Sequence, residues 1–340
     1  MDNNNEKTLG LPGLRIIGTG SHIPPVVKTN DEFREFIDTT DEWIAARTGI
    51  RERHYNFTSQ NHVMGADASE KALLAAGVPA GDIDLIIAVT CTADYFYPAL
   101  STLIQKQIGA DNAACFDVNL ACAGFVAGLD IAHSYLTSGK YEKILVVSSE
   151  TLSKHTDFRD RSTCILSGDG AGAAVVVPAS GKAFVSHLGA EGEVAEDSAL
   201  YCKTGCATNA PFPEAENAEK YPETPPRMIM DGHAVYKFAV SSLSTMVKAV
   251  TKKAGVNISD VDMFITHQAN LRIIESAMAK MKVPAEKYYV NIHKYGNMSS
   301  ACIPVCLDEL YRSGKIVPGM KLCLLGYGGG LAYGGIYMES

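Results

Sequence analysis

The sequence predicts an α/β fold made of two copies of one structural unit. Residues 76–87 and 254–265 match at an offset of 178 in the numbering, and each segment reads as a helix end, a glycine stop, a short loop and a buried strand. Two further pairs of matching segments follow in the same order. Because each copy alternates strands with helices, we expect parallel sheets covered by helices.

The second and third matches extend the repeat toward the end of the chain. Residues 117–123 lie opposite residues 295–301, again at an offset of 178, and residues 138–140 lie opposite residues 313–315 at an offset of 175. A strand is expected shortly after each member of the third pair. A single match of this kind arises by chance in α/β folds, whereas three in order indicate a duplication.

The duplication divides the chain into an N-terminal half, residues 1–180, and a C-terminal half, residues 181–340. Residues 191–227 break the pattern because they are rich in Glu, Ala and Pro and lack the periodicity of a helix or strand. We expect a long surface excursion here. Long ordered loops often cover sites, and this one either does so or is solvated decoration.

Composition restricts the class of protein. The chain has 340 residues, of which 46% are hydrophobic and 20% charged, as in an ordinary globular protein. A net charge of -8 argues against a broad nucleic-acid surface. No apolar run is long enough to span a membrane, and the polar N-terminus has no signal-peptide layout. We therefore expect a cytoplasmic protein.

Nine cysteines in such a protein suggest free thiols rather than disulfides. Cys202 and Cys206, like Cys302 and Cys306, are spaced C-x-x-x-C, but no histidine joins them at the spacing of zinc ligands. No metal site is expected.

Cys122 is the candidate nucleophile. It follows a strand-like segment, residues 114–118, and helical apolar spacing begins at or just after it. Free backbone N–H groups and the positive end of a helix dipole at such a junction favour a thiolate. From this segment alone, a buried packing cysteine is an equal alternative.

Polar residues after two other predicted strands suggest a site that stabilises negative charge. His267 and Asn270 directly follow a buried strand, at the end where open α/β folds place their sites. Both are neutral donors suited to an oxyanion or enolate. Asn297 alone reads as a turn residue, but the repeat places it opposite the segment that carries Cys122.

Two glycine runs follow or precede strands. Residues 326–330 lack the Lys-Ser/Thr of a phosphate loop, and their glycines either let backbone N–H groups approach a reacting carbonyl or form a plain turn. Residues 168–172 form either a tight turn, which we favour, or a phosphate contact. Trp43 and Arg47 are four residues apart and so share one helix face. They either clamp an aromatic ligand or form a cation–π pair on the surface, and the residues alone favour the surface pair.

Six segments together resemble the β-ketoacyl-acyl-carrier-protein synthase III family, the initiating condensing enzymes of bacterial fatty-acid synthesis. They run in the family's order over nearly the whole chain and are highly specific in combination. They are residues 41–53 (DEWIAARTGIRER), 119–125 (NLACAGF), 168–173 (GDGAGA), 267–274 (HQANLRII), 295–301 (YGNMSSA) and 326–330 (GYGGG). The resemblance implies a thiolase-like fold, two pseudo-symmetric α/β halves with a layered αβαβα core, in a homodimer.

The resemblance also implies the catalytic set. Cys122 would accept the acyl group of an acyl-CoA primer, and His267 and Asn297 would complete the triad that drives decarboxylation of malonyl-acyl carrier protein. The N–H groups of Cys122 and Gly329 would form the oxyanion hole. The product would be a 3-oxoacyl-carrier protein, with the coenzyme A thioester as a substrate and no resident metal or organic cofactor.

Binding residues follow from the same resemblance. Trp43 and Arg161 would stack on the adenine of coenzyme A, and Tyr97 would line the acyl pocket of the partner subunit. Tyr327 would also belong to the acyl pocket. Further implied contacts are Thr39, Arg47 and Asn270 for coenzyme A, and Lys237, Arg272 and Lys280 for the acidic carrier protein. No nucleic acid or membrane partner is implied.

Three departures from the family pattern leave the preferred acyl primer open. His233 replaces an asparagine, Tyr97 and Tyr327 stand where phenylalanine is common, and the excursion at 191–227 is longer than usual. The rival functions are a related thiolase-fold starter enzyme or acyltransferase of secondary metabolism, a non-catalytic partner subunit and a cysteine hydrolase. Non-catalytic partners typically lack the cysteine that this chain keeps.

Overall fold

The computed structural model describes residues 13–192, 197–203 and 227–340, and two mixed sheets form its framework. The first sheet has the strand order β1–β7–β6–β4–β5 and the second has the order β12–β11–β13–β14–β8. The strands of the first are β1 (Gly13–His22), β7 (Asp169–Ala179), β6 (Ile144–Thr151), β4 (Leu85–Val89) and β5 (Ala114–Val118). The strands of the second are β12 (Tyr288–Tyr289), β11 (Met263–Thr266), β13 (Lys321–Gly328), β14 (Ala332–Glu339) and β8 (Phe184–Ala190).

Both sheets use the same pairing directions. β4 runs parallel to β5 and β6, as β11 runs parallel to β12 and β13. The remaining pairs, β6–β7 and β7–β1 in one sheet and β13–β14 and β14–β8 in the other, are antiparallel. The expectation of parallel sheets is therefore correct only for the three strands at one side of each sheet. The equal order and directions are those of a duplicated unit.

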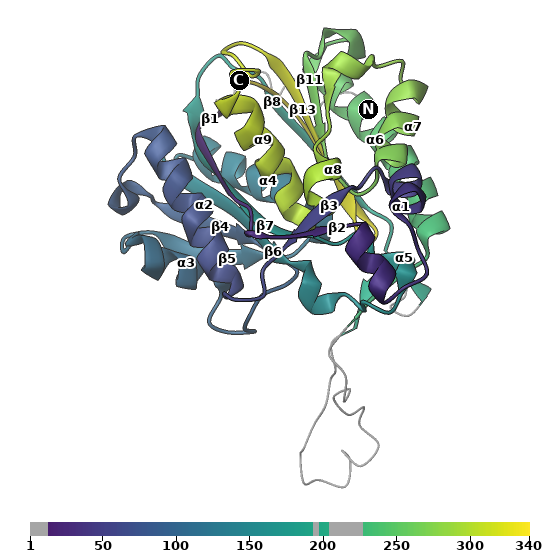
Figure 1. Ribbon diagram of the computed structural model, residues 1–340. Helices are drawn as coiled ribbons and strands as arrows, with labels where there is room; N and C mark the ends of the chain where they lie inside the picture. The colour runs from purple at the N-terminus through teal and green to yellow at the C-terminus, as the bar shows by residue number, and fades with distance from the viewer. Residues whose placement is uncertain (1–12, 193–196, 204–226) are drawn as a thin grey trace, which may run out of the picture.

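The helices form three layers around the two sheets (Figure 1). α4 (Gly124–Thr137) and α9 (Cys302–Arg312) lie between the sheets, where their apolar side chains join one core with residues of both. α2 (Asn61–Ala76) and α3 (Leu100–Ile108) cover the outer face of the first sheet. α6 (Gly232–Ala254) and α7 (Leu271–Lys280) cover the outer face of the second. This order of layers confirms the predicted αβαβα fold class.

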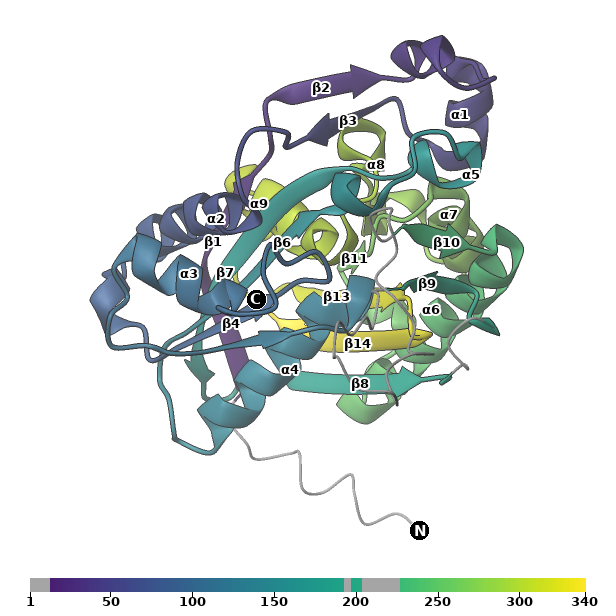
Figure 2. The same cartoon turned by 90° about the horizontal axis from the view of Figure 1, so that it is seen from below.

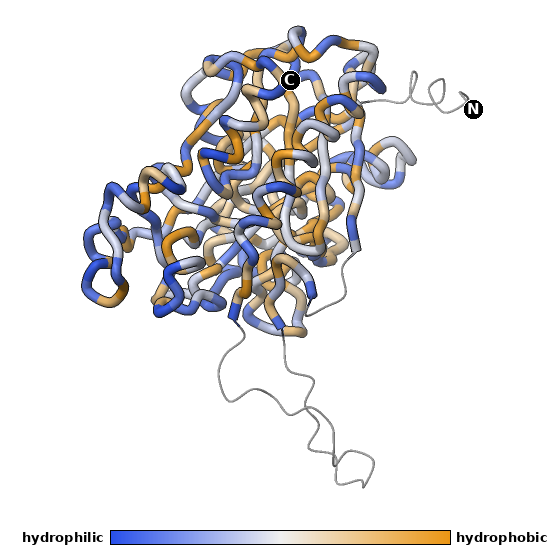
Figure 3. The backbone as a smooth tube through the Cα atoms, turned by 90° about the vertical axis from the view of Figure 1, so that its right-hand side faces the viewer, coloured by the Kyte–Doolittle hydropathy of each residue, from blue (hydrophilic) through white to orange (hydrophobic). Residues whose placement is uncertain are grey.

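Local sequence explains why the elements form where they do. β4 and β6 are buried along their whole length, as expected of apolar strands covered by helices on both faces. α2 and α6 end at Gly77 and Gly255, whose φ angles of +65° and +68° suit the left-handed helix stop that glycine adopts at low cost. Figure 3 shows hydrophobic segments gathered inside the molecule and hydrophilic segments mainly at its periphery.

Smaller elements lie beside this framework (Figure 2). β2 (Val26–Thr29) and β3 (Glu52–Tyr55) form an antiparallel ribbon, with α1 (Asp41–Thr48) between them in the chain. Within the described ranges the remaining helices are α5 (Arg161–Cys164) and α8 (Ile292–Tyr295), and the short 3-10 turns are η1 (Asp31–Glu35), η2 (Ala80–Asp82), η3 (Ala121–Ala123), η4 (Leu152–His155), η7 (Ile258–Asp260), η8 (Ala285–Lys287) and η9 (Ser299–Ala301).

The stretch predicted to lack regular structure contains a strand. β9 (Leu200–Cys202) pairs antiparallel with β10 (Met228–Met230), which begins just after the stretch ends. A three-residue strand is too short to produce a periodic signal in the sequence. Residues 193–196 and 204–226, most of the predicted excursion, lie outside the described residues.

The boundary between the halves lies near the predicted residue 180, where β7 ends at Ala179 and β8 begins at Phe184. The division into two domains stays a prediction, since α4 and α9 share one core with both sheets. None of the described helices combines the length and the apolar character needed to cross a membrane.

Candidate active site

Two short turns, one from each half, meet at the centre of the site. η3 precedes α4 and packs against β13 of the other sheet, while η9 precedes α9 and packs against β6. Ala121 and Ser299, which occupy equivalent positions in the repeat, carry positive φ angles of 42° and 50°. Side chains other than glycine hold such angles only where the surroundings enforce them, often at functional sites. The duplication thus predicted which two segments come together.

A cavity of about 660 Å³ opens beside these turns. It brings together most of the residues predicted to act on a substrate. Those on its wall are Trp43, Arg47, Cys122, Arg161, Asn270, His267, Asn297, Tyr327 and Gly329. Leu200, Tyr201 and Cys202 of β9 also line it, so the described part of the excursion covers the site.

Cys122 lies in η3, two residues before α4 begins. Its thiol donates a hydrogen bond to Ser299 Oγ, 3.4 Å away. Burial raises the pKa of the Cys122 thiol to about 12, and the Ser299 hydrogen bond offsets only part of that effect. The prediction that the helix start favours a thiolate is therefore wrong for the free protein, because burial of the thiol raises its pKa more than the hydrogen bonds around it lower it. The thiol is protonated at neutral pH and must lose its proton during the reaction.

His267 follows β11, and its backbone N–H donates to the carbonyl of Leu325 at 2.8 Å. The imidazole is buried and meets the Tyr327 ring edge-on, with ring centroids 5.2 Å apart. Burial lowers the pKa of His267 to about 3, against a smaller opposing effect from the backbone of Ser299. His267 is thus uncharged at neutral pH, so it has one N–H to donate and one nitrogen that accepts.

Asn297 is held by backbone and side chain together. Its Oδ1 accepts the N–H of Ser299 at 2.8 Å, which leaves the Nδ2 protons as its free donors. Its own N–H donates to the carbonyl of Leu166, and its carbonyl accepts from Gly168, both at 2.8 Å. A Cβ on Gly168 would lie 2.1 Å from the carbonyl oxygen of Tyr295, so only glycine fits there.

The two glycine runs differ in local structure: residues 329–331 form the turn between β13 and β14, whereas residues 169–172 belong to a strand. Residues 169–172 begin β7 rather than forming the tight turn that we favoured. β13 likewise extends through Gly328, past its predicted end at residue 325. Gly329 lines the cavity opposite Ala121. A Cβ atom built on Gly329 would lie 3.8 Å from the Cβ of Ala121. The oxyanion-hole role of Gly329 stays a prediction.

Two guanidinium groups contact the Trp43 indole. Arg47 Cζ is 4.2 Å and Arg161 Cζ 4.7 Å from its ring centroid. Asn270 caps α7, because its Oδ1 accepts a hydrogen bond from the backbone N–H of Arg272. Its Nδ2 donates to the carbonyl of Arg47 at 3.0 Å, and this bond connects α7 to α1. Because all of these side chains except that of Arg272 line the cavity, the Trp43–Arg47 pair is part of a cleft and not an isolated surface contact.

Other predicted residues lie apart from the cavity wall. Thr39 precedes α1, and its buried Oγ1 has no partner among the described residues. Tyr97 is 87% exposed, on the loop between β4 and α3. The three predicted docking residues and His233 are exposed as well; they are Lys237 on α6 and Arg272 and Lys280 at opposite ends of α7.

Sequence reasoning missed a buried polar group beneath Cys122. Glu150, at the end of β6, is fully buried and accepts hydrogen bonds from the side chains of Thr90, Thr92 and Ser300 and from the backbone and thiol of Cys91. Ser300 occupies the position in the second copy of the repeat that Cys122 occupies in the first. That equivalence was the one available signal for it.

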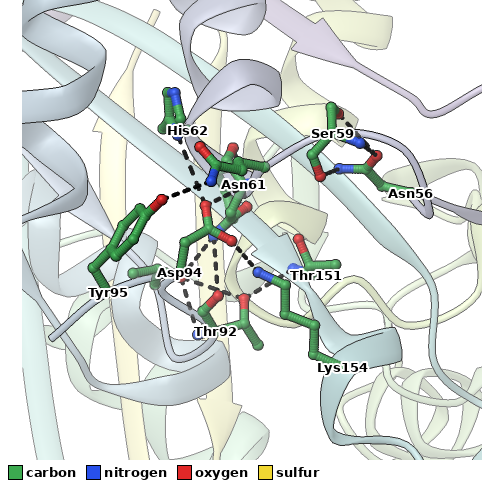
Figure 4. Close-up of polar contacts among 12 residues, drawn as sticks. Asn56, Ser59, Asn61, His62, Thr92, Asp94, Tyr95, Thr151 and Lys154 are labelled. Atoms are coloured by element: carbon green, nitrogen blue, oxygen red, sulfur yellow. Dashed lines mark hydrogen bonds and ion pairs between the residues drawn. The ribbon is translucent and has the colours of Figure 1, made fainter.

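Neighbouring contacts fix the loop between β4 and α3, where Figure 4 labels Thr92, Asp94 and Tyr95. Asp94 accepts from the backbone N–H of Asn61 at 2.6 Å and pairs with Lys154. Thr92 joins that loop to Thr151 at the end of β6, at 2.8 Å. The loop is therefore anchored to the start of α2 and to residues that follow the buried Glu150.

Metal ligation finds no support in the part of the chain that the structure describes. No group of three or more His, Cys, Asp or Glu side chains there is arranged to hold an ion. The eight cysteines within the described ranges are all free thiols, and Cys206 lies outside them.

Comparisons with known proteins agree on one family. The family model for 3-oxoacyl-[acyl-carrier-protein] synthase III matches residues 116–192, and the model for the C-terminal part of the same enzymes matches residues 251–340. A β-ketoacyl-[acyl-carrier-protein] synthase III of Clostridium acetobutylicum is 38% identical over 97% of this chain and 99% of its own length. One of Fusobacterium nucleatum is 40% identical over 95% and 98%.

Solved structures give the same result. The 3-oxoacyl-[acyl-carrier-protein] synthase III of Aquifex aeolicus has a TM-score of 0.87 and 38% identity, over 96% of this chain and 100% of its own. The priming β-ketosynthase of the R1128 polyketide biosynthetic pathway has a TM-score of 0.88 and 35% identity, over 97% of each chain. The resemblance predicted from the motifs is confirmed.

Proposed function

This chain belongs to the 3-oxoacyl-[acyl-carrier-protein] synthase III family, and we propose that its Cys122 cavity performs the family's condensation in two half-reactions. The chain is an acyltransferase that initiates fatty-acid synthesis. It joins an acyl primer from coenzyme A to malonyl-acyl carrier protein. The observation that carries the residue assignment is that Cys122, His267 and Asn297 line one cavity with Trp43 and Arg161.

In the first half-reaction the Cys122 sulfur attacks the thioester carbonyl of the primer. The tetrahedral oxyanion is placed at the N–H groups of Cys122 and Gly329, and coenzyme A leaves as its thiolate. Support comes from Gly328, because its missing side chain lets β13 approach within contact distance of Cys122. In this proposal the two donors of the oxyanion hole are backbone N–H groups, one from η3 and one from the turn after β13.

In the second half-reaction malonyl-carrier protein enters the same cavity and loses carbon dioxide. The enolate oxygen is held by an N–H of His267 and by Nδ2 of Asn297, each worth about 2.7–4 kcal/mol in comparable oxyanion sites. An uncharged His267 and an Asn297 whose Oδ1 is already occupied both suit a donor role. The enolate carbon then attacks the acyl-cysteine and gives the 3-oxoacyl-carrier protein.

Coenzyme A is assigned to the cleft at Trp43. Its adenine would enter between the indole and the Arg161 guanidinium, which are already in cation–π contact, while Arg47 and Thr39 lie nearby. Asn270 is placed along the pantetheine arm. Lys237 and Arg272 are assigned to the acidic carrier protein, with Lys280, farther along α7, as an outer contact.

A homodimer is part of the proposal. β5 is the edge strand of its sheet and is partly exposed along its length, and Phe96 and Tyr97 on the loop before α3 are 81% and 87% exposed. An open edge and exposed aromatics are features that a partner subunit would cover. Tyr97 of the partner subunit would then close the acyl pocket, beside Tyr327.

The proposed steps use protein groups alone, with the coenzyme A thioester as a substrate rather than a resident cofactor. A cytoplasmic location is proposed from the free thiols of the described cysteines, which suit a reducing compartment. No nucleic acid or membrane is assigned as a partner.

The test is condensation of malonyl-carrier protein with a panel of short, branched and longer acyl-CoA primers. Formation of 3-oxoacyl-carrier protein is the expected result, and the best primer defines the acyl pocket. A wild-type protein that forms no 3-oxoacyl product from any primer, yet is folded and dimeric, contradicts the proposal. A preference for primers that do not occur in fatty-acid synthesis would favour the rival function, a starter enzyme of secondary metabolism like the polyketide priming enzyme.

A further inference from the structure

A continuous chain of hydrogen bonds leads from the nucleophile to a buried carboxylate. Cys122 donates to Ser299 Oγ at 3.4 Å. The Ser299 hydroxyl and the Cys91 sulfur are 3.5 Å apart, and the Cys91 thiol donates to the Glu150 oxygens at 3.5 and 3.6 Å. None of these links is needed to hold the enolate or the coenzyme. The two half-reactions assign no role to the side chains of Ser299, Cys91 and Glu150.

We propose that Ser299, Cys91 and Glu150 form a proton relay that removes the thiol proton of Cys122 as its sulfur attacks the primer. This inference rests on the proposed function and adds the acceptor of the Cys122 proton, which that function leaves unassigned.

The order of donors and acceptors in these hydrogen bonds allows proton transfer in one direction only. With Cys122 donating at one end and Cys91 donating to Glu150 at the other, the Ser299 hydroxyl is left to donate to Cys91. The Cys122 proton then passes to Ser299 Oγ, the Ser299 proton to Cys91 Sγ and the Cys91 proton to Glu150. Every bond that breaks is matched by one that forms, and the negative charge moves from Glu150 to Cys122.

Glu150 is the acceptor at the far end of these hydrogen bonds. Its carboxylate is fully buried, all its contacts come from donors, and it forms no ion pair with any residue of the described ranges. A carboxylate in such a setting accepts hydrogen bonds only. His267 is a poor alternative, because burial disfavours its cation and because its role requires the neutral ring.

The relay also balances the complete reaction. In acylation, the primer thioester, the Cys122 thiol and the Glu150 carboxylate become the acyl-cysteine, a coenzyme A thiolate and a protonated Glu150. The leaving thiolate takes a proton from solvent. When the carbon–carbon bond has formed, Cys122 leaves as a thiolate and Glu150 returns its proton through Cys91 and Ser299. The thiol is then ready for the next turnover.

Cys91 is the link best suited to a test, because it is partly accessible at the cavity wall while Glu150 and Ser299 also hold η9 in place. The Cys91→Ala substitution interrupts the series of hydrogen bonds but keeps Glu150, the proposed proton acceptor. Cys91→Ser restores an O–H that both accepts and donates. Cys323→Ala, which removes a buried thiol from the core on the other face of the second sheet, is the matched control.

The measurement is the rate of coenzyme A release in the acylation half-reaction, between pH 6 and pH 10. For Cys91→Ala we expect a loss of about 100-fold at pH 7, within the usual range for a general base, that shrinks as rising hydroxide replaces the relay. Cys91→Ser should recover to within about tenfold of wild type. Primer-independent decarboxylation of malonyl-carrier protein, which uses His267 and Asn297, should not change.

Acylation by Cys91→Ala with the wild-type rate and pH profile would overturn the relay. So would a loss that is the same at every pH and extends equally to decarboxylation, because that is the result of altered packing. A wild-type protein that takes no acyl group overturns the proposed function instead. In that event alkylation of Cys122 by iodoacetamide still tests the relay, since it requires removal of the same proton and should be slowed by Cys91→Ala at pH 7.

Discussion

A Cβ atom built on Gly328 would lie 2.8 Å from the Cβ of Cys122 and 3.1 Å from its Sγ. Real Cβ atoms do not approach that closely, so Gly328→Ala must push β13 and η3 apart at the reacting sulfur. We expect acylation of the enzyme by acyl-CoA to fall about 100-fold or more, because a misplacement of about 1 Å has that effect on aligned groups. Quenched-flow measurement of acyl-enzyme formation checks this.

Gly81→Ala is the matched control for that variant. A Cβ there meets no atom within 4 Å, and its φ is not in the left-handed region. The control should acylate at the wild-type rate, and both variants should unfold within a few degrees of wild type. Equal acylation by Gly328→Ala and Gly81→Ala would show that the contact with Cys122 is not needed.

Cys122 and His267 should separate the two half-reactions. Labelled acyl-CoA should label the wild-type protein but not Cys122→Ala, whereas Cys115→Ala, which removes a thiol outside the cavity, should still be labelled. His267→Ala should lose about 100- to 1,000-fold in malonyl decarboxylation, because one donor to the enolate is removed. Its self-acylation should change far less. Equal loss of both activities in His267→Ala would contradict the enolate role.

Trp43 offers a test of the coenzyme site that needs no second variant. Removing the indole in Trp43→Ala deletes the ring that Arg47 and Arg161 contact at 4.2 and 4.7 Å. We expect KM for acyl-CoA to rise about tenfold with kcat little changed, as for loss of uniform binding. A truncated thioester that lacks the adenine nucleotide should serve the variant and the wild type equally well. A similar defect with the truncated substrate would place the role of Trp43 elsewhere.

The repeat explains how much of this site was predictable. Its constant offset placed Asn297 opposite Asn119, and the matched positive φ angles of Ala121 and Ser299 are its structural expression. The strand ends, the helix starts and the glycine run follow from local pattern. Each of these features depends on residues that are adjacent in the sequence, so the sequence alone could indicate them.

Glu150 and Cys91 were not predictable in the same way. They stand at the ends of two neighbouring strands, and their contacts with η9 exist only after both halves have packed. The error over the Cys122 thiolate has the same origin. A helix start is visible in sequence, but the burial that raises the thiol pKa depends on β13 closing over the sulfur. Long-range packing decides both, and no local pattern records it.

The lowered pKa of His267 gives a pH dependence that sets it apart from an exposed histidine. Burial disfavours the imidazolium and brings the pKa to about 3, so the ring stays neutral as the pH falls from 8 to 5. An ordinary histidine would be half protonated near pH 6.5. Decarboxylation of malonyl-carrier protein should therefore show no inflection near 6.5, and the ring-proton NMR signals of His267 should not titrate in this range. His267→Gln keeps a side-chain donor and should share the flat profile at a reduced rate. A wild-type inflection near pH 6.5 that disappears in His267→Gln would mean that the imidazole is exposed to water during decarboxylation and changes charge there.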